Sequence, residues 1–453
     1  MKLHQSITLL LAVIAAPSFL SAAPEPAKKQ PNIVLIMADD LGYNDLGCYG
    51  HPQIKTPVLD QLAKSGVRLT NFYSGSTVCT PSRMALLTGA YPTRLGWTEG
   101  VVGYLIDPKK GLSPKALTIA EIFKSQDYAT GLIGKWHLGD REPFRPHRQG
   151  FDYTYYINKS NNQSKTIWRG DEVVEKPFEN RLLSEKFTNE AIGFIQRNKA
   201  KPFFLYLPFT APHFPVQAHP DWKGKSAFGA ADDGKKPHDY GAVVEELDHR
   251  IGQILASLKE QKVDQNTIVI FLSDNGPQGG QKAQSTPYRG TKWSALEGGN
   301  RVPCIISWPG TIPAGQENDA LTAAIDLLPS LCHACDIDLP SITKDSPVID
   351  GLNVFDSITG AKDLNHPRKD LLIWHGKEGF HSIRMGNWKL FLNAADAKIP
   401  GAPQSGTALF KLSKDAAELH NLSSQFPEKV QEMRTLAKRR LADIHQNIIP
   451  LGE

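Results

Sequence analysis

The sequence predicts an α/β protein, with a large and mostly parallel central sheet flanked by helices, followed by a smaller C-terminal α+β part. Three observations predict this fold class. Short, uninterrupted apolar runs alternate with amphipathic helical segments through most of the chain. Polar and charged residues follow directly after several of those runs. Near Asp370 the pattern changes to short strand-like segments separated by glycine-containing turns.

Residues 1–23 have the layout of a secretory signal peptide. Lys2 precedes an apolar run at 7–16, and small residues follow it around Ala22. Because that run is short for a membrane span, we expect cleavage near Ala22 rather than a retained anchor, which stays the alternative. No later segment is long and apolar enough to predict a span. The expected location is therefore the periplasm or the exterior of the cell, or the lysosome or exterior in a eukaryote.

The length of 453 residues allows one large and one smaller domain after the signal peptide. We predict a catalytic α/β domain over 24–365 and a small antiparallel-sheet domain over 366–453. The net charge of +4 is weak and dispersed, which argues against nucleic acid as a partner. Five scattered cysteines are too few for a disulfide framework, and Cys332 and Cys335 lie in an apolar stretch that predicts a buried helix.

The elements follow from their hydrophobic patterns. Continuous apolar runs are typical of strands buried on both faces of a parallel sheet, and longer amphipathic stretches are typical of helices. In the large domain the predicted strands are 32–37, 67–73, 129–133, 202–207 and 267–272, and the predicted helices are 56–66, 117–125, 181–198 and 239–261. In the small domain the predicted strands are 370–375, 380–385, 388–392 and 408–412, followed by a helix at 427–445.

Reactive side chains follow the predicted strands. In parallel sheets ligands bind beyond the C-terminal ends of the strands, so these side chains are candidates for one site. Adjacent carboxylates repel each other unless a cation or hydrogen-bond donors compensate them. Oxygen ligands suit Ca²⁺ or Mg²⁺, whereas zinc favours histidine and cysteine. The candidates at strand ends are Asp39, Asp40, Lys135, His137, His213, Asp274 and Asn275.

A second candidate feature is the segment Val-Cys-Thr-Pro-Ser-Arg at 78–83. Pro81 suits the first turn of a helix, where its missing N–H has no intrahelical partner in any case. Cys79 would then face the unpaired N–H groups of the helix start, which favour an anion. An inert, buried cysteine is the alternative interpretation. A divalent cation together with basic side chains stabilises charge on a transferring sulfuryl or phosphoryl group, and the chain offers Arg83, Lys135, His137, His213 and Lys292.

An ordered series of motifs resembles the sulfatase family, within the alkaline-phosphatase-like superfamily. Cys79-Thr-Pro-Ser-Arg83 matches the family's Cys-x-Pro-Ser-Arg signature, and Gly89 to Arg94 continues it. A single motif of this length would be weak evidence, but the whole series in order is very specific. The other matching motifs are Asp39-Asp40-Leu-Gly, Gly134-Lys-Trp-His-Leu-Gly139, Pro212-His213, Asp274-Asn-Gly276, Gly290-Thr-Lys292 and Glu297-Gly-Gly299.

The resemblance implies a specific mechanism. Cys79 would be oxidised to formylglycine by a separate maturing enzyme during export, and the aldehyde would be hydrated. One hydroxyl would attack sulfur and release the alcohol, and the other would then expel sulfate, which splits one difficult step into two. Ca²⁺, with Mg²⁺ as the alternative, would be held by Asp39, Asp40, Asp274, Asn275 and the modified Cys79.

The resemblance also implies a role for each basic residue. Arg83 and Lys135 would position and polarise the hydrate. His137 would accept the proton that triggers sulfate release. Lys292 and His213 would bind the sulfate and assist the departing oxygen.

For the substrate, the sequence predicts a chemical class but not a particular sugar or sulfated position. Segments 211–219 and 239–248 resemble the arylsulfatase and N-acetylgalactosamine-6-sulfatase branch, which implies a sulfated sugar or polysaccharide fragment. One alternative is a phosphodiester or phosphonate monoester hydrolase on the same scaffold. Another is a secreted glycan-binding protein without activity, if Cys79 stays a thiol. Six residues outside the motifs are candidates for stacking on sugar rings, although most are expected to be ordinary core or loop residues: Trp97, Tyr104, Trp168, Arg169, Trp222 and Trp374.

Overall fold

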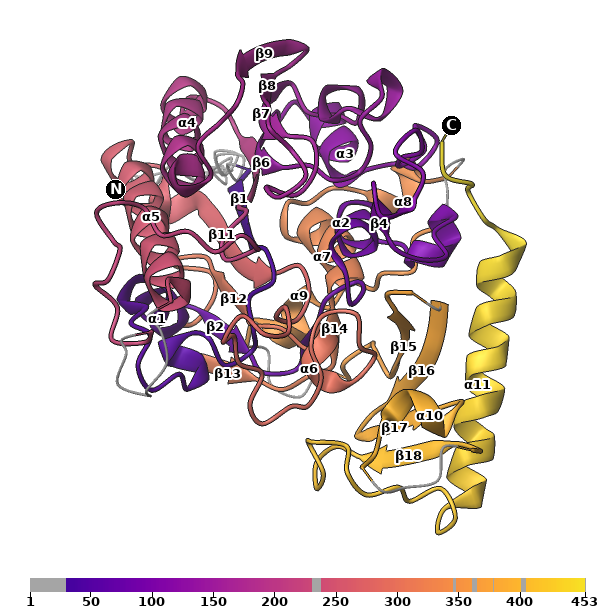
Figure 1. The fold of residues 1–453 in the computed structure, drawn as a ribbon. Helices are drawn as coiled ribbons and strands as arrows, with labels where there is room; N and C mark the ends of the chain where they lie inside the picture. The colour runs from indigo at the N-terminus through magenta and orange to yellow at the C-terminus, as the bar shows by residue number, and fades with distance from the viewer. Residues whose placement is uncertain are drawn as a thin grey trace, which may run out of the picture.

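A computed structural model describes residues 30–229, 238–344, 348–360, 365–377, 379–400 and 405–452 (Figure 1). The predicted signal peptide lies outside the described residues. The chain forms a large body around one twisted sheet, and its C-terminal part forms a smaller sheet with a long helix at one side of that body (Figure 1). Among the residues that the structure describes, no helix combines the length and the apolar character that crossing a membrane requires.

The large sheet has ten strands, and its centre is parallel. Adjacent parallel strands run in the order β11 (Thr267–Ser273), β1 (Asn32–Ala38), β10 (Phe203–Pro208), β6 (Ala129–Lys135) and β7 (Tyr153–Ile157). Antiparallel pairings occur toward both edges, through β12 (Cys304–Ser307) and β2 (Val67–Leu69) on one side and β8 (Ile167–Arg169) and β9 (Glu172–Glu175) on the other. The edge strand β13 (Gln316–Asn318) pairs with β2 in parallel.

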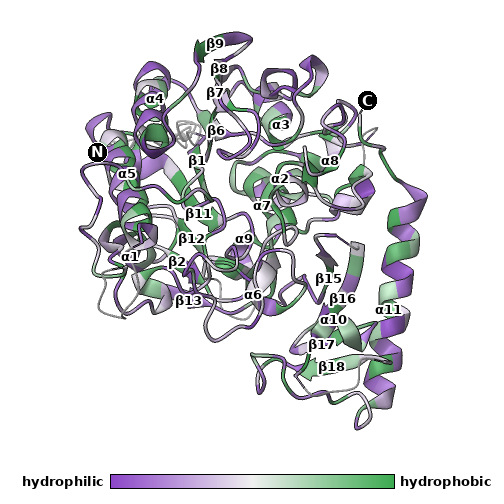
Figure 2. Cartoon of the chain, viewed as in Figure 1, coloured by the Kyte–Doolittle hydropathy of each residue, from purple (hydrophilic) through white to green (hydrophobic). Residues whose placement is uncertain are grey.

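Hydrophobic clusters cover both faces of this sheet. Alternate residues of β1 belong to different clusters, with Ile33, Leu35 and Met37 in one and Val34 and Ile36 in the other. This division follows from the two-residue period of a strand and explains why the strands read as continuous apolar runs. Figure 2 shows the same hydrophobic colour along the central strands.

Helices form a layer against each cluster. On one face lie α1 (Pro57–Lys64), α4 (Leu183–Asn198) and α5 (Tyr240–Glu260), with α5 packed against the other two. On the other face lie α2 (Cys79–Thr88), α3 (Ile119–Ser125) and α7 (Leu327–Ala334) (Figure 1). The predicted fold class, a mixed and mostly parallel sheet between helical layers, is thus confirmed. The shorter elements are β4 (Val101–Val102), β5 (Leu105–Ile106), α6 (Glu297–Asn300), α8 (Leu339–Ile342), α9 (Phe355–Ile358) and α10 (Ala394–Ala397).

The C-terminal sheet is antiparallel, as predicted. Its strands run in the order β15 (Asp370–His375), β16 (Gly379–Met385), β17 (Trp388–Phe391) and β18 (Ala408–Lys411). Helix α11 (Pro427–Gln446) packs against this sheet and buries Met433, Ala437 and Ile444 along one side. The alternation of hydrophobic and hydrophilic residues along α11 in Figure 2 is that of an amphipathic helix.

Buried ions join the small sheet to the large body. The Lys389 Nζ of β17 lies 2.9 Å from a carboxylate oxygen of Glu297 and 2.9 Å from one of Glu418. The hydroxyl of Tyr73, in the short strand β3 (Phe72–Tyr73), donates a hydrogen bond to Glu297, and Arg384 of β16 donates one to Tyr73. Burial opposes the charge on Glu297, but Lys389, Arg384 and Arg301 together lower its pKa to about 2. One hydrophobic cluster contains residues of both the large body and the small sheet, so no break in the core marks a boundary between them. The domain boundary at 365–366 stays a prediction.

The predicted strand at 67–73 is two strands that belong to different sheets. β2 ends at Leu69, and β3 (Phe72–Tyr73) pairs instead with β14 (Thr322–Ala323). Asn71 lies between them, and its side-chain amide donates a hydrogen bond to the carbonyl of Asp319. This bond, across 248 residues, ties the gap between β2 and β3 to the segment that leads into β14. The prediction of one continuous strand was wrong.

Candidate active site

Four adjacent strands end at one edge of the sheet and carry the candidate side chains there. β1 is followed by Asp39 and Asp40, and its neighbour β11 is followed by Asp274 and Asn275. β6 ends in Lys135, two residues before His137. β10 lies between β1 and β6 and leads within five residues to His213. Because these four strands are parallel, their carboxyl ends meet, and the structure brings the predicted residues together.

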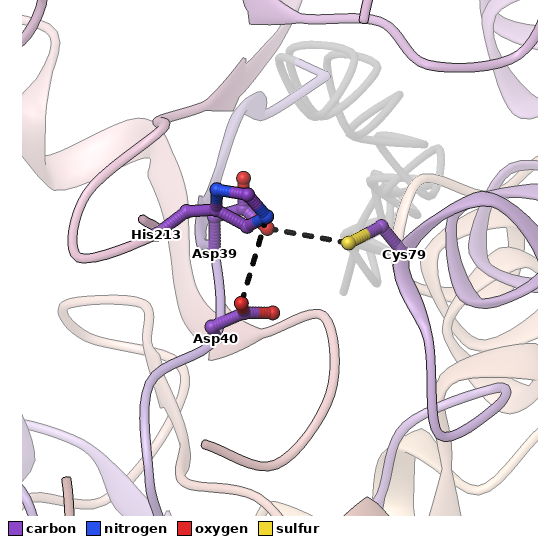
Figure 3. Close-up of side chains that lie close together, drawn as sticks. All are labelled: Asp39, Asp40, Cys79 and His213. Atoms are coloured by element: carbon purple, nitrogen blue, oxygen red, sulfur yellow. Dashed lines mark hydrogen bonds and ion pairs between the residues drawn. The ribbon is translucent and has the colours of Figure 1, made fainter. Parts of the chain in front are cut away.

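Helix α2 points its N-terminus at the same place. Val78 has an extended conformation before the helix, Cys79 is the first helical residue, and every residue of α2 is buried. The Sγ atom of Cys79 lies 3.5 Å from Asp39 Oδ1 and 3.3 Å from Lys292 Nζ. Figure 3 shows Cys79 facing Asp39, with Asp40 and His213 beside them. Burial raises the pKa of the Cys79 thiol to about 12, so the encoded thiol is protonated at neutral pH and is a weak nucleophile.

The site balances three carboxylates against three cationic side chains. Lys135 Nζ lies 2.6 Å from Asp39 Oδ2, and Lys292 Nζ lies 2.7 Å from Asp40 Oδ1. Arg83 Nη2 lies 2.8 Å from Asp274 Oδ2. Burial alone would raise the pKa of Asp39, but Lys135 and its other cationic neighbours hold that pKa well below its usual value. The pKa of Asp274 instead rises to about 6, because of burial and of the nearby Asp39 carboxylate.

His213 is neutral and presents a free ring nitrogen. Its Nδ1 lies 2.6 Å from the carbonyl oxygen of Phe214 and 2.9 Å from Asn161 Oδ1, so Nδ1 carries the proton and donates. The lone pair on Nε2 therefore faces Asp40 Oδ2 at 3.6 Å. Burial lowers the pKa of His213 to about 4, which leaves the ring uncharged at neutral pH. Two lone pairs facing each other at this distance favour a cation between them.

His137 presents the opposite nitrogen. Its Nε2 lies 3.2 Å from the carbonyl oxygen of Val102 and donates to it, which leaves the lone pair on Nδ1. That Nδ1 is buried and has no hydrogen-bond partner in the described ranges. Burial, then Lys135 and Arg83, hold the pKa of His137 well below its usual value. A neutral imidazole with a free Nδ1 is able to accept a proton.

Thr80, which was not predicted as a site residue, holds the backbone of His137 in place. The Thr80 hydroxyl donates to the His137 carbonyl at 2.9 Å and accepts from the Val102 N–H at 3.1 Å. His137 itself has a positive φ of 61°, an uncommon conformation for this residue that these contacts support. Asn161, which orients His213, was missed as well. Thr80 lies inside the cysteine motif, so its position was a usable signal, but nothing in the sequence marks Asn161.

A divalent cation fits the acidic part of the site. Ligand atoms of Asp39, Asp40, Cys79 and His213 lie within 4.8 Å of one another. Asn275 donates through Nδ2 to Asp40 Oδ1 at 2.7 Å, and its Oδ1 is buried with no hydrogen-bond partner that the structure describes. An unpaired buried amide oxygen beside carboxylates is the donor chemistry of a hard cation. His213 lies in the same cluster, and Asp274 is paired with Arg83, so the predicted ligand set stays a prediction.

A cavity of about 510 Å³ opens above these residues. Cys79, His137, His213 and Lys292 line its inner end. Of the six residues predicted as candidates for sugar stacking, Tyr104 lines this cavity, whereas Trp97 and Trp374 are fully buried. Trp168 packs under Arg145, Arg169 pairs with Glu190, and Trp222 packs against His249. The other lining residues used below are Tyr104, Phe214, Trp293, Asn162, Gln278 and Gln281.

The fold and this site define a hydrolase of anionic esters with the alkaline-phosphatase-like architecture. A family model described as Sulfatase matches residues 31–337. The chain belongs to the sulfatase family and is a sulfuric ester hydrolase.

Two similar relatives and one solved structure support this assignment. The arylsulfatase of Hemicentrotus pulcherrimus is 32% identical over 80% of this chain and 67% of its own length. The human N-acetylgalactosamine-6-sulfatase is 34% identical over 89% of this chain and 83% of its own length. The crystal structure of Ps i-CgsB has a TM-score of 0.80 at 28% identity and covers 93% of this chain and 95% of its own.

Proposed function

We propose that this protein is an exported sulfatase that hydrolyses sulfate esters of carbohydrates, with a formylglycine made from Cys79 and a bound Ca²⁺. The observation that carries the proposal is the position of Cys79. Its Sγ lies at the start of a buried helix, within 3.5 Å of both an acidic group and a lysine. Helix N–H groups, Lys292 and a cation would together favour a sulfate group at that point.

Two similar proteins support a carbohydrate substrate. The human relative is named for N-acetylgalactosamine-6-sulfate hydrolysis. Ps i-CgsB also has a crystal structure in complex with k-i-k-neocarrahexaose, at 28% identity to this chain and a TM-score of 0.78. We extend this class of substrate to the present chain because its cavity, at about 510 Å³, has room for a sugar ring beside the sulfate.

Conversion of Cys79 is supported by its surroundings. The pKa of the thiol, raised to about 12, makes an unmodified Cys79 a poor nucleophile, although it lies at the centre of the site. A hydrated aldehyde carries two hydroxyl groups on one carbon and supplies both a nucleophile and a route to release sulfate. Cys79 is 1% exposed and every residue of α2 is buried. A maturing enzyme would therefore act before the chain folds, which agrees with modification during export.

The proposed cation would be held by Asp39, Asp40, Asn275 and the modified residue 79, with Asp274 completing the set. Ca²⁺, or Mg²⁺ as the alternative, would polarise the sulfate and attract an anionic substrate. The charge balance supports this role. Three carboxylates already face three cationic side chains, so a divalent cation would leave the site with net positive charge.

The basic residues take roles that match their geometry. Arg83 donates two hydrogen bonds to Asp274 and one to the Lys135 carbonyl, so it holds two strand ends in place. Lys135 and Arg83 would orient the hydrate of residue 79. His137 would accept a proton at Nδ1. Lys292 would bind the sulfate from the cavity side. His213 would assist the departing oxygen in its protonated form, with a proton on Nε2 as well as on Nδ1, which the negative charge of the bound sulfate would favour.

A phosphodiesterase on the same scaffold is the second candidate function, and substrate comparison separates the two. We expect kcat/KM for 4-nitrophenyl sulfate to exceed that for bis(4-nitrophenyl) phosphate by at least about a hundredfold, or about 2.7 kcal/mol. The reason is that residue 79 and Lys292 lie buried at one end of the cavity, where a group with a single ester arm needs less room than a diester. Equal rates, or a preference for the diester, would refute the sulfatase proposal.

Metal binding should stabilise the fold. At a Ca²⁺ concentration of about 100 Kd, the free energy of unfolding should rise by about 2.7 kcal/mol, seen as a higher Tm in a chelator-to-calcium titration. Asp40→Asn should abolish most of that rise, because Asp40 contacts both Asn275 and Lys292. Asp221→Asn, at an exposed position, is the matched control. A Tm that responds equally in both variants would place the cation elsewhere.

A further inference from the structure

The outer part of the cavity differs chemically from its inner end. Among the described residues that line it, the one lysine, Lys292, lies buried at the inner end with His137 and His213, where the sulfate would bind. The outer wall is formed by aromatic rings and by uncharged amide side chains, from Tyr104, Phe214, Trp293, Asn162, Gln278 and Gln281. Tyr104 and Phe214 are 47% and 53% exposed, so their rings are available to a ligand.

Trp293 is fixed in an unusual conformation beside Lys292. Its φ is +76°, a left-handed value that a bulky residue rarely adopts, and its N–H donates to the Thr77 carbonyl at 2.9 Å. The ring contacts Tyr104 edge to face, with the centroids 5.7 Å apart. The turn between β15 and β16 supports it, because a Cβ at Gly376 would come within 2.6 Å of the ring. The small sheet thus holds one wall of the cavity in place.

The amide groups come from two loops. Gln278 and Gln281 lie between β11 and Lys292, and Asn162 follows β7. Amides both donate and accept hydrogen bonds, so they match sugar hydroxyl groups. A carboxylate or a second sulfate would need a cation instead, since an unpaired anion is costly to desolvate. Lys377 is exposed, and its Nζ lies 5.5 Å from the centroid of the Trp293 ring, but Lys377 does not line the cavity.

We propose that this outer wall is a subsite for an uncharged pyranose, so that the substrate is a neutral sugar bearing the sulfate and no further anionic group beside it. The inference rests on the proposed function and specifies its substrate. Trp293 and Tyr104 would contact the ring, and Gln278 and Gln281 would bind its hydroxyls. Apolar aryl or steroid esters would displace water from those amides without replacing its hydrogen bonds.

The first test compares sugars of equal size. The wild-type enzyme is assayed on monosulfated galactose and N-acetylhexosamines, and on sulfated uronates and disulfated hexosamines. We expect kcat/KM to be at least about tenfold higher for the best neutral monosulfate than for the best doubly anionic sugar. A preference for the doubly anionic sugars, or no hydrolysis of any sugar sulfate, would overturn the subsite.

The second test changes the wall. Gln281→Lys should raise kcat/KM for doubly anionic sugars relative to neutral ones by at least about tenfold. Gln265→Lys is the matched control, because Gln265 precedes β11 at the end opposite to the site and should change neither rate. Trp293→Asn removes the ring, and asparagine tolerates the left-handed backbone at this position. Loss of the ring should appear mainly as a higher KM for the neutral sugar. Equal effects of the two lysine variants would refute the assignment of Gln281.

The outcomes separate this inference from the proposed function. If the wild-type enzyme hydrolyses 4-nitrophenyl sulfate but shows none of the expected sugar preferences, the subsite is wrong and the sulfatase activity stands. If no sulfate ester is hydrolysed by protein whose Cys79 is converted, the proposed function itself fails.

Discussion

Replacement of Cys79 by serine should reduce turnover of 4-nitrophenyl sulfate by at least about four orders of magnitude, or about 5.4 kcal/mol. Serine has a similar size and would keep the contacts to Asp39 and Lys292. It offers one hydroxyl where a hydrated aldehyde offers two, so a sulfate accepted by serine would have no second hydroxyl to expel it. Steady-state kinetics of the purified variant, made in cells that contain the maturing enzyme, measure the loss.

The control for this prediction is the state of residue 79 in the wild-type protein. Mass spectrometry of the peptide spanning Thr77 to Arg83 should show a mass lower than that of the thiol form, as expected for an aldehyde. Active protein with an unmodified thiol would contradict the mechanism. Fully unmodified and inactive protein that still binds sulfated sugars would favour the glycan-binding alternative.

Much of the catalytic edge could be predicted because its residues are tied to strand ends. Asp39, Lys135 and Asp274 each stand at or directly after an apolar run, and parallel pairing of β1 with β10 and β11 brings such ends together. Continuous apolar runs indicate which segments are buried strands. Because those strands are parallel, their carboxyl ends lie at one edge of the sheet, which brings the side chains together. Strand β6 extends to Lys135, two residues beyond its predicted end, without moving the site.

The missed features depend on contacts between segments far apart in sequence. Asn161 orients His213 across 52 residues, and the small-sheet turn at Gly376 supports Trp293. The left-handed backbone of Trp293 leaves no mark in the sequence, since the favoured residues there are glycine and asparagine. Strands such as β7 and β12 were missed because each is five residues or fewer and lies beside longer irregular segments.

The position of His213 in the sequence does not decide whether it contacts the sulfate or the cation. The sequence placed it among the basic, sulfate-handling residues, because a histidine after a strand end serves either role. The structure puts its neutral Nε2 3.6 Å from Asp40 Oδ2, inside the group that fits a cation. Which partner it meets depends on the tautomer, and the tautomer depends on Asn161 and on the Phe214 carbonyl.

His137→Ala and Lys292→Ala should each lower steady-state turnover by at least about two orders of magnitude, the usual scale for general acid–base groups. The two variants should differ in the first turnover. Without His137 the alcohol is still released once, so rapid mixing should show a burst of nitrophenol followed by a slow phase. Without Lys292 the release of the alcohol itself is slowed, and no burst should appear.

The geometry makes the His137 variant the more decisive of the two. Its Nδ1 has no hydrogen-bond partner among the described residues, so alanine removes one donor contact, to the Val102 carbonyl. Because alanine also removes a buried ring at a positive φ, the Tm of this variant is measured as well. Lys292 neutralises Asp40, so the Tm of Lys292→Ala must be measured beside that of the exposed Lys223→Ala control. Turnover within tenfold of wild type in folded His137→Ala, or a burst in Lys292→Ala, would show that these two roles are assigned wrongly.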